Sequence, residues 1–309
     1  MSKLCYPLTL ILTYLTAGAA PGLLAQDLKG LGKVGVVELV QGGFQFVEGP
    51  TKTPDGSIYF TDIPAESIFR RDPQGAITLF LKPSGYANGL MFGGDGTLLA
   101  CQMDGQLVSI DLQTKDVRIL AKEYRDKRFN ACNDLVIDRD GGIYFTDPRY
   151  RAPEPWPQVK EAFYYRTSEG EVTRLGDNLL APNGIALSPD EKTLYVVPSL
   201  QAEMMAYEVA APGKLGASRV LCRLQQVGNA TNGGGDGLAV DRQGNLYITS
   251  AAGIQVFSSQ GALLGIISTP EQPANCAFGG PDNKTLFITA RTGLYQCKMP
   301  ISGHLQRTQ

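Results

Sequence analysis

The sequence predicts an all-β protein, a six-bladed β-propeller whose four-stranded blades surround a central metal-binding channel. The first observation is a recurring phrase, an Asp/Gly turn followed by apolar-Tyr-apolar-Thr: PDGSIYFT at 54–61, DGGIYFT at 140–146 and QGNLYIT at 243–249. Weaker copies fill the gaps: DGTLLAC at 95–101, PDEKTLYVV at 189–197 and PDNKTLFIT at 281–289. Each copy follows a short apolar stretch, which is typical of a β-hairpin. Six copies in one chain indicate six blades.

The second observation is that another strand-like run follows each hairpin. These runs are IFRRD at 68–72, LVSID at 107–111, FYYRT at 163–167, MMAYEV at 204–209, IQVFS at 254–258 and GLYQC at 293–297. Residues 26–309 average about 47 residues over six units, which is the length of a four-stranded blade. Sustained helical periodicity is absent, so we expect one domain over 26–309. The competing fold, a pair of β-sandwiches, predicts no column of equivalent residues across the units.

The first segment of the chain, residues 1–25, has the pattern of a secretory signal peptide. Lys3 supplies a positive charge, a mostly apolar run follows, and small residues offer cleavage after Ala20 or Ala25. The alternative, an uncleaved membrane anchor, needs about twenty uninterrupted apolar residues, whereas Pro7 and several Gly and Thr interrupt this run. We therefore expect an exported protein, periplasmic or secreted, with no membrane attachment after cleavage.

Composition excludes several function classes. The 309 residues carry 28 Lys and Arg against 30 Asp and Glu, a formal net charge of −2, so the basic excess of a nucleic-acid-binding protein is missing. The one histidine, His304, lies near the C-terminus and no GxSxG segment occurs, which argues against a serine triad. The five cysteines after residue 25 lack paired metal or redox spacings, and we interpret them as packed small hydrophobes, with one disulfide left open.

A column of polar residues supports the propeller. Counting back eleven or twelve residues from the aligned second strands reaches one Asp, Glu or Asn in each repeat: Glu48, Asn88, Asn133, Asn183, Asp236 and Asn275. The innermost strands of a propeller line its channel, so these six side chains are predicted to converge. Turn chemistry is the alternative, because Asn-Gly and Asp-Gly pairs form turns. However, Glu48 is no turn former and Asn133 is followed by Asp134.

The column has the ligand chemistry of a divalent cation site. Two carboxylates in a partly desolvated channel are costly unless a cation pairs with them. All donors are oxygens, without imidazole or thiolate, which favours Ca²⁺ or Mg²⁺, with Ca²⁺ preferred, and less strongly Mn²⁺ or Zn²⁺. We expect Glu48, Asn183 and Asp236 to bind one ion directly. Asn133 is assigned as a fourth ligand or a substrate contact, and Asn88 as a substrate contact.

Four motifs in order are similar to those of one known family. They are Glu48-Gly49-Pro50 before PDGSIYFTD, CNDLVIDRDGGIYFTDPRY at 132–150, PNGIALSPDEKTLYV at 182–196 and GDGLAVDRQGNLYIT at 235–249. Across nearly all of residues 26–309 the chain resembles the senescence-marker-protein and gluconolactonase family, the regucalcin-like lactonases. The resemblance implies a six-bladed propeller with one catalytic divalent metal in its channel, and hydrolysis of sugar lactones, related esters or sometimes phosphoesters.

The resemblance also implies roles for individual residues. The family's metal ligands fall on Glu48, Asn183 and Asp236, its substrate- or metal-contacting Asn on Asn133, and its catalytic carboxylate on Asp236. Asp236 is therefore assigned as the general base that takes a proton from water activated by the metal. The substrate shell departs from the family pattern at Ala87, Gln102, Ala131, Arg151 and Pro198.

An extra stretch at 149–162 contains Tyr150 and the only tryptophan, Trp156. Loops long for their fold tend to be functional, so we expect a lid over the metal in which Tyr150 and Trp156 form an apolar or sugar-stacking wall. The alternative is a surface loop with Trp156 packed on the neighbouring blade. Asp147, just before this stretch, is either a strand-ending residue before Pro148 or a second acid/base.

Together these patterns predict a metal-dependent hydrolase acting on a small-molecule lactone or ester. The alternatives are a protein-interaction propeller in which the metal only joins the blades, a calcium-binding protein without turnover, and a phosphoester hydrolase of the same fold. Two acids with several neutral Asn leave positions on the ion for water and substrate, which favours catalysis. The sequence does not identify the lactone or the oligomeric state.

Overall fold

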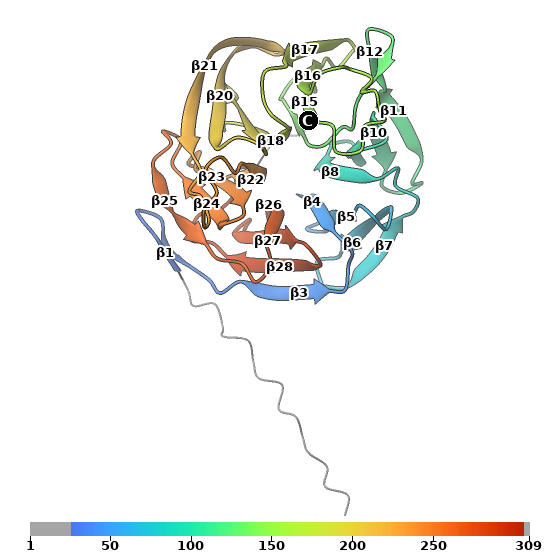
Figure 1. The fold of residues 1–309 in the computed structure, drawn as a ribbon. Coiled ribbons are helices and arrows are strands. Elements are labelled where there is room, and N and C mark those ends of the chain that lie inside the picture. Colours follow the sequence, from blue (N-terminus) through green and yellow to red (C-terminus); the bar gives the residue numbers. More distant parts are fainter. Residues whose placement is uncertain (1–25, 306–309) are drawn as a thin grey trace, which may run out of the picture.

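The computed structural model describes residues 26–305 and has the predicted fold, a six-bladed β-propeller. Six four-stranded antiparallel sheets stand around a central opening, and the chain visits them in order around the ring (Figure 1). The predicted signal peptide, residues 1–25, lies outside the described residues. Between residues 26 and 305 the regular elements are strands, and no helix long and apolar enough to cross a membrane occurs there.

In the first three blades the chain runs from the innermost strand, beside the channel, to the outermost. Blade one consists of β4 (Val47–Lys52), β5 (Ile58–Asp62), β6 (Ser67–Arg71) and β7 (Ile77–Leu81). Blade two consists of β8 (Ala87–Phe92), β9 (Thr97–Gln102), β10 (Gln106–Asp111) and β11 (Val117–Ala121). Blade three consists of β14 (Leu135–Ile137), β15 (Ile143–Asp147), β16 (Ala162–Arg166) and β17 (Val172–Gly176).

The other three blades repeat this pattern. Blade four consists of β18 (Pro182–Leu187), β19 (Thr193–Pro198), β20 (Glu203–Ala211) and β21 (Lys214–Arg223). Blade five consists of β22 (Gly235–Val240), β23 (Leu246–Ser250), β24 (Gly253–Phe257) and β25 (Leu263–Ile267). Blade six consists of β26 (Pro273–Gly279), β27 (Thr285–Ala290), β28 (Gly293–Lys298) and β3 (Glu38–Gly42). Two short ribbons lie outside the blades: β1 (Gln26–Leu28) with β2 (Gly32–Val34), and β12 (Glu123–Tyr124) with β13 (Lys127–Arg128).

The last blade is completed by a strand from the start of the chain. β3 pairs antiparallel with β28, with Leu294 opposite Gln41, so blade six joins the two ends of the described chain (Figure 1). This pairing closes the ring without a covalent link. The sequence patterns predicted the strands that follow each hairpin to within one residue at their starts, but they did not predict β3.

The hydrophobic core lies between neighbouring blades. Each cluster of buried apolar side chains draws on two adjacent sheets; one example combines Tyr247 and Val256 of blade five with Phe278 and Leu286 of blade six. The tyrosine of the repeated phrase belongs to these contacts, and Tyr247 is fully buried. The five cysteines of the described residues are all buried and free, as packed small hydrophobes. None of them forms the disulfide that the sequence left open.

The threonine of the repeated phrase fixes the inner strand of the next blade. In three blades its hydroxyl donates a hydrogen bond to a backbone oxygen at the level of the polar column. These bonds join Thr61 to Asn88 at 3.1 Å, Thr146 to Asn183 at 2.7 Å and Thr249 to Ala274 at 2.7 Å. All three threonines are fully buried, so each bond satisfies groups that water cannot reach. The motif therefore sets the spacing of the channel wall.

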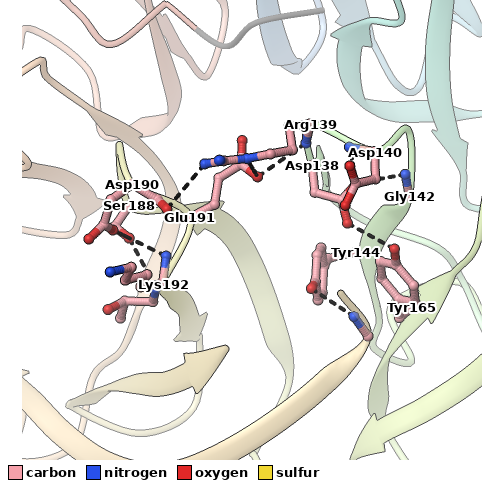
Figure 2. Close-up of polar contacts among 12 residues, drawn as sticks. Asp138, Arg139, Asp140, Gly142, Tyr144, Tyr165, Ser188, Asp190, Glu191 and Lys192 are labelled. Atoms are coloured by element: carbon pink, nitrogen blue, oxygen red, sulfur yellow. Dashed lines mark hydrogen bonds and ion pairs between the residues drawn. The ribbon is translucent and has the colours of Figure 1, made fainter. Parts of the chain in front are cut away.

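The turns that follow the inner strands are built by acidic side chains. Asp138 accepts backbone N–H groups from Asp140 at 3.0 Å and Gly142 at 2.7 Å, and it also accepts the Tyr165 hydroxyl at 2.8 Å (Figure 2). The adjacent Arg139 donates to Glu191 at 2.9 Å and so links blade three to blade four. The Arg139 side chain is 58% exposed, so this ion pair adds little stability. Because these turns come after the inner strands, they lie at the opposite channel end from the column.

Candidate functional site

The structure places all six column residues at one end of the channel, where the inner strands begin. Glu48, Asn88, Asn183 and Asp236 are each the second residue of an inner strand, Asn275 is the third residue of β26, and Asn133 precedes β14 by two residues. Five of the six side chains are buried, with exposed fractions between 3% and 6%, and Asp236 is partly exposed. The predicted convergence is therefore present in the backbone arrangement.

Glycine follows four of the six column residues because the neighbouring inner strand comes too close for a side chain. A Cβ atom on Gly49 would overlap the backbone oxygen of Asn88, and one on Gly237 would overlap the side chain of Asn275. Gly49 also has a φ of 45°, which favours glycine. The Glu-Gly, Asn-Gly and Asp-Gly pairs thus begin strands that pack closely around a channel. They do not form tight turns.

Four of the column side chains interact directly. Asn183 hydrogen-bonds to Asp236, and Asn275 hydrogen-bonds to Glu48. Asn275 Oδ1 accepts the backbone N–H of the next residue at 2.8 Å, so its NH₂ group faces the carboxylate. Glu48 Oε2 accepts the N–H of its own next residue at 2.8 Å. Asn275 is therefore a donor to Glu48, whereas Asn88 and Asn133 are placed beside this group by their strands.

Asp134 is a third carboxylate at the column, and the sequence patterns gave it no role. Its Oδ1 accepts the backbone N–H of Leu135 at 2.9 Å, and its carboxylate also accepts a hydrogen bond from Asn275. The side chain is only 9% exposed. It stands where glycine follows the column residue in four other blades. Comparing the residues after the column would have found it, since an acid there is the exception.

Burial raises the pKa of all three carboxyl groups. Burial, followed by the charge on Asp236, raises the pKa of Glu48 well above its ordinary value. Burial likewise raises the pKa of Asp236, while a hydrogen bond from Asn183 acts in the opposite direction. Burial raises the pKa of Asp134 to about 7. The channel thus holds more acidic groups than the protein alone can keep charged at neutral pH.

The donor set fits a divalent cation. Buried carboxylates that favour protonation in the protein alone are groups from which a cation displaces protons. The carboxylates of Glu48 and Asp236 and a carboxamide oxygen of Asn183 are hard donors of the kind that Ca²⁺ takes. Across residues 26–305 no three His, Cys, Asp or Glu side chains are grouped closely enough to hold an ion by themselves. An ion here would therefore need carboxamide ligands beside the carboxylates.

Beyond the column the channel widens into a cavity of about 400 Å³. Asp134 and Asn275 line its column end, and its walls are mostly apolar residues of the inner strands. His304 lines the other end, where its backbone N–H donates to the oxygen of Val240 at 2.9 Å, at the end of β22 far from Asp236. The one histidine is thus in the channel but on the far side from the acids.

The loop after β15 crosses blade three at the mouth of the channel. The Arg151 guanidinium lies 3.5 Å from the ring centroid of Tyr86, at the start of blade two. The neighbouring Tyr150 points its hydroxyl to Ser199 and Asn183 of blade four, while 47% of the residue is exposed. The segment therefore contacts both blade two and blade four beside the column. Its role as a lid over a metal stays a prediction.

Trp156 is held by its own loop. Its Nε1 donates to Glu154 at 2.6 Å, and the Arg149 guanidinium lies 4.6 Å from its ring centroid. Arg149 also pairs with Glu161 at 3.7 Å. The loop thus brings Tyr150 to Asn183, while the contacts of Trp156 are to Glu154 and Arg149 of the same loop. Substrate binding by Trp156 stays a prediction.

Asp147 forms hydrogen bonds with the backbone of the segment just before Asn133. Its carboxylate accepts the backbone N–H groups of Asn130 at 2.9 Å and Ala131 at 2.7 Å, and the residue is fully buried. Asp62 makes the same pair of bonds in blade one, to two N–H groups before β4. Burial raises the pKa of Asp147 to about 7. The geometry supports the strand-ending role over a second acid/base.

Comparison with known proteins agrees with this arrangement. The model of a family described as the SMP-30/gluconolactonase/LRE-like region matches residues 46–292. The chain belongs to this family. The match begins just before β4 and ends after β27, so it includes all six column residues.

Several known proteins are similar to this chain over most of their length. A gluconolactonase of Zymomonas mobilis is 34% identical over 281 residues, which is 82% of this chain and 78% of that protein. Diisopropyl-fluorophosphatase of Loligo vulgaris is 27% identical over 273 residues, 78% of this chain and 84% of that protein. The solved structure of a gluconolactonase from Xanthomonas campestris is 28% identical, with a TM-score of 0.79 and coverage of 90% and 94%. A calcium-binding regucalcin of Agrobacterium tumefaciens, 20% identical with a TM-score of 0.75, shares the fold over 88% of this chain and 98% of that one.

This family member differs from the expected pattern mostly around the channel mouth. The Nε2–H group of Gln102 donates a hydrogen bond to the backbone oxygen of Ser84 at 2.9 Å, and the residue is 8% exposed. Arg151 lies on Tyr86, and Pro198 ends β19 beside Ser199. Ala87 and Ala131 are buried and small. These five residues, which the sequence analysis marked as departures from the family pattern, thus lie at the end of the channel that holds the column.

Proposed function

We propose that this protein is a divalent-cation-dependent lactonase that opens sugar lactones. The observation that carries the proposal is the pairing of two channel carboxylates, Glu48 and Asp236, with Asn183 at one mouth of the propeller. Membership of the gluconolactonase family and the 34% identity to a named gluconolactonase support the substrate class. The named lactone-hydrolysing relatives support a small-molecule substrate.

Ca²⁺ is the preferred ion of the proposal, and Mg²⁺, Mn²⁺ or Zn²⁺ are the alternatives. Glu48, Asn183 and Asp236 would hold it, with Asn133 as a fourth ligand or a substrate contact. Oxygen-only donors suit Ca²⁺ and Mg²⁺ better than Zn²⁺. When bound, a divalent cation supplies Lewis acidity, which polarises a lactone carbonyl and makes water easier to deprotonate.

The protein's own residues supply the proton transfers. Asp236 is the proposed general base, because it is the partly exposed acid of the column and the one histidine, His304, lies at the other end of the channel. It takes a proton from the attacking water and returns it to the alkoxide that leaves when the ring C–O bond breaks. Asn183 donates to Asp236 and keeps its carboxylate oriented. Asn88 on β8 and Asn133, two residues before β14, are the proposed contacts for substrate hydroxyl groups.

A phosphoester substrate is the second candidate. The similarity to diisopropyl-fluorophosphatase of Loligo vulgaris supports it, and the same carboxylates would serve attack at phosphorus. A binding role without turnover is the outcome if the ion binds and neither ester is hydrolysed.

Export remains part of the proposal. Residues 1–25 have the charge and apolar pattern of a signal peptide, with cleavage after Ala20 or Ala25. Expression of the full chain with subsequent N-terminal sequencing of the exported fraction tests this. Export would be ruled out if the protein stayed inside the cell with its N-terminus uncleaved.

Proton release from glucono-1,5-lactone tests the activity. The purified protein is treated with chelator and then reloaded with Ca²⁺, Mg²⁺, Mn²⁺ or Zn²⁺ in turn, with Asp236→Ala as the blank. We expect turnover that returns with one ion and is absent in the variant. Turnover of a chromogenic phosphotriester without lactone hydrolysis would move the function to the second candidate. Turnover that survives chelation would exclude the metal mechanism.

A further inference from the structure

Ser199 stands between two of the candidate metal ligands. It follows β19 directly, and its Oγ accepts a hydrogen bond from Asn183 Nδ2 at 3.1 Å. The same Oγ donates to the backbone oxygen of Gly235 at 2.7 Å. Gly235 is the residue before Asp236, so one hydroxyl contacts the side chain of one ligand and the backbone leading to the other.

The direction of these bonds follows from elementary chemistry. A serine hydroxyl has a single proton, and a carbonyl oxygen only accepts. The proton of Ser199 therefore goes to Gly235, and its oxygen is left to accept from Asn183. If the amide oxygen of Asn183 lay beside Ser199, its lone pairs would face a lone pair of the Ser199 oxygen. The NH₂ group of Asn183 therefore lies beside Ser199. The carboxamide oxygen of Asn183 consequently points away from Ser199.

The backbone of Ser199 reinforces this position. Its N–H donates to the oxygen of Ala181 at 2.9 Å, before β18, and its carbonyl accepts from Gly234 at 3.2 Å, before β22. Four hydrogen bonds thereby join Ser199 to the segments that carry Asn183 and Asp236. Tyr150 of the mouth loop points its hydroxyl at the same pair, Ser199 and Asn183.

We propose that Ser199 is a positioning residue of the metal site, which fixes the carboxamide of Asn183 with its oxygen toward the cation and holds the strand of Asp236 in register with it. The proposal deepens the proposed function, because it concerns the same site, and it rests on that function only for the identity of the ligands. Hydrogen-bonding partners of metal ligands typically change metal affinity by about 10- to 100-fold when removed.

Calcium affinity of the chelator-treated protein tests this role directly. Isothermal titration with CaCl₂ compares the wild-type protein with Ser199→Ala, Ser199→Cys and Ser199→Thr. We expect Ser199→Ala and the similarly sized Ser199→Cys to raise the Kd by about tenfold, because both lose the strong acceptor for Asn183. Ser199→Thr keeps the hydroxyl and should stay within about twofold of wild type.

A matched control is present one blade further on. Ser250, the last residue of β23, is buried and donates its hydroxyl to Gly253 at 2.9 Å inside its own turn. Ser250→Ala removes a comparable hydroxyl without touching Asn183, so its Kd should equal that of wild type. Melting curves in chelator for each variant show whether the fold is retained, and Ser199→Thr keeps the test decisive if Ser199→Ala does not fold.

The outcomes separate this inference from the proposed function. A wild-type protein that binds Ca²⁺ but hydrolyses no lactone removes the proposed function, while the affinities of the variants still decide the role of Ser199. Lactone hydrolysis with an unchanged Kd in Ser199→Ala overturns the positioning role alone. An equal loss in Ser250→Ala, or a wild-type protein that binds no divalent cation, also overturns it.

Discussion

At the scale of single residues, the chemistry of the site depends on how each acid is compensated. Asp147 and Asp134 are both buried, and burial raises the pKa of each to about 7. Asp147 uses both oxygens to accept backbone N–H groups, whereas Asp134 shares a channel with Glu48 and Asp236. Buried aspartates therefore have different roles in this protein. Substitution of Asp236 and of Asp147 distinguishes a role in the site from a role in the fold.

Asp236→Asn tests the acid proposed as ligand and base. Asparagine keeps the shape of the side chain but neither accepts a proton nor brings a negative charge, so we expect kcat to fall by about 100-fold or more. The Kd for Ca²⁺ should rise in the same variant, because one charged ligand is lost. Asp282→Asn, an exposed turn residue, is the control and should leave both constants unchanged. Undiminished hydrolysis in Asp236→Asn would remove the base assignment.

Asp147→Asn tests the acid that we assign to the fold. The new NH₂ group would face the N–H of Asn130 or Ala131, leaving a buried donor without an acceptor. We expect the free energy of unfolding to fall by about 1–3 kcal/mol in urea titration, with kcat within about twofold of wild type at 25 °C. A large loss of kcat at unchanged stability would instead make Asp147 a second acid/base.

At the scale of the strand and the loop, local sequence patterns predicted most of the blade strands. Pairings between segments far apart in the chain were not predicted. The repeated phrase predicted the second strand of every blade and the run after it predicted the third, because turn residues and alternating apolar residues act locally. β3 was not predicted because its partner, β28, lies at the other end of the chain. The column was predicted by position, but the amide orientation of Asn275 depends on contacts that appear only in the folded channel.

Trp156→Ala tests the loop at the mouth. The Trp156 ring is held by Glu154 and Arg149 of the same loop, outside the six sheets, so its loss should change the melting temperature little. The same contacts shape the segment that carries Tyr150, and we expect KM for the lactone to rise several-fold with a smaller change in kcat. Steady-state kinetics and thermal melting on one preparation give both numbers. A large drop in melting temperature with constant KM would place Trp156 in the packing.

At the scale of the whole molecule, the ring concentrates negative charge at one end of its channel. Inner strands approach so closely that glycine is needed after four column residues, and this brings acids from separate blades together. The closure by β3 and β28 holds the ring while these acids repel one another. The propeller thus uses the packing of its blades to maintain a site that is unfavourable without a cation.

This arrangement predicts how stability changes with pH. An Asp with an ordinary pKa of about 3.9 in the unfolded chain loses its proton there first, while Asp134 and Asp147 keep theirs in the folded protein up to about pH 7. The folded state then binds more protons, so the free energy of unfolding decreases as the pH rises through this window. In chelator, we therefore expect the melting temperature to fall as the pH is raised from about 4 to about 7. Saturating Ca²⁺ should reduce the fall, because a bound cation compensates the channel carboxylates. Thermal melting across this pH range, with chelator and with Ca²⁺, checks both parts, and a melting temperature that rises with pH in chelator would contradict the charge balance inferred for the channel.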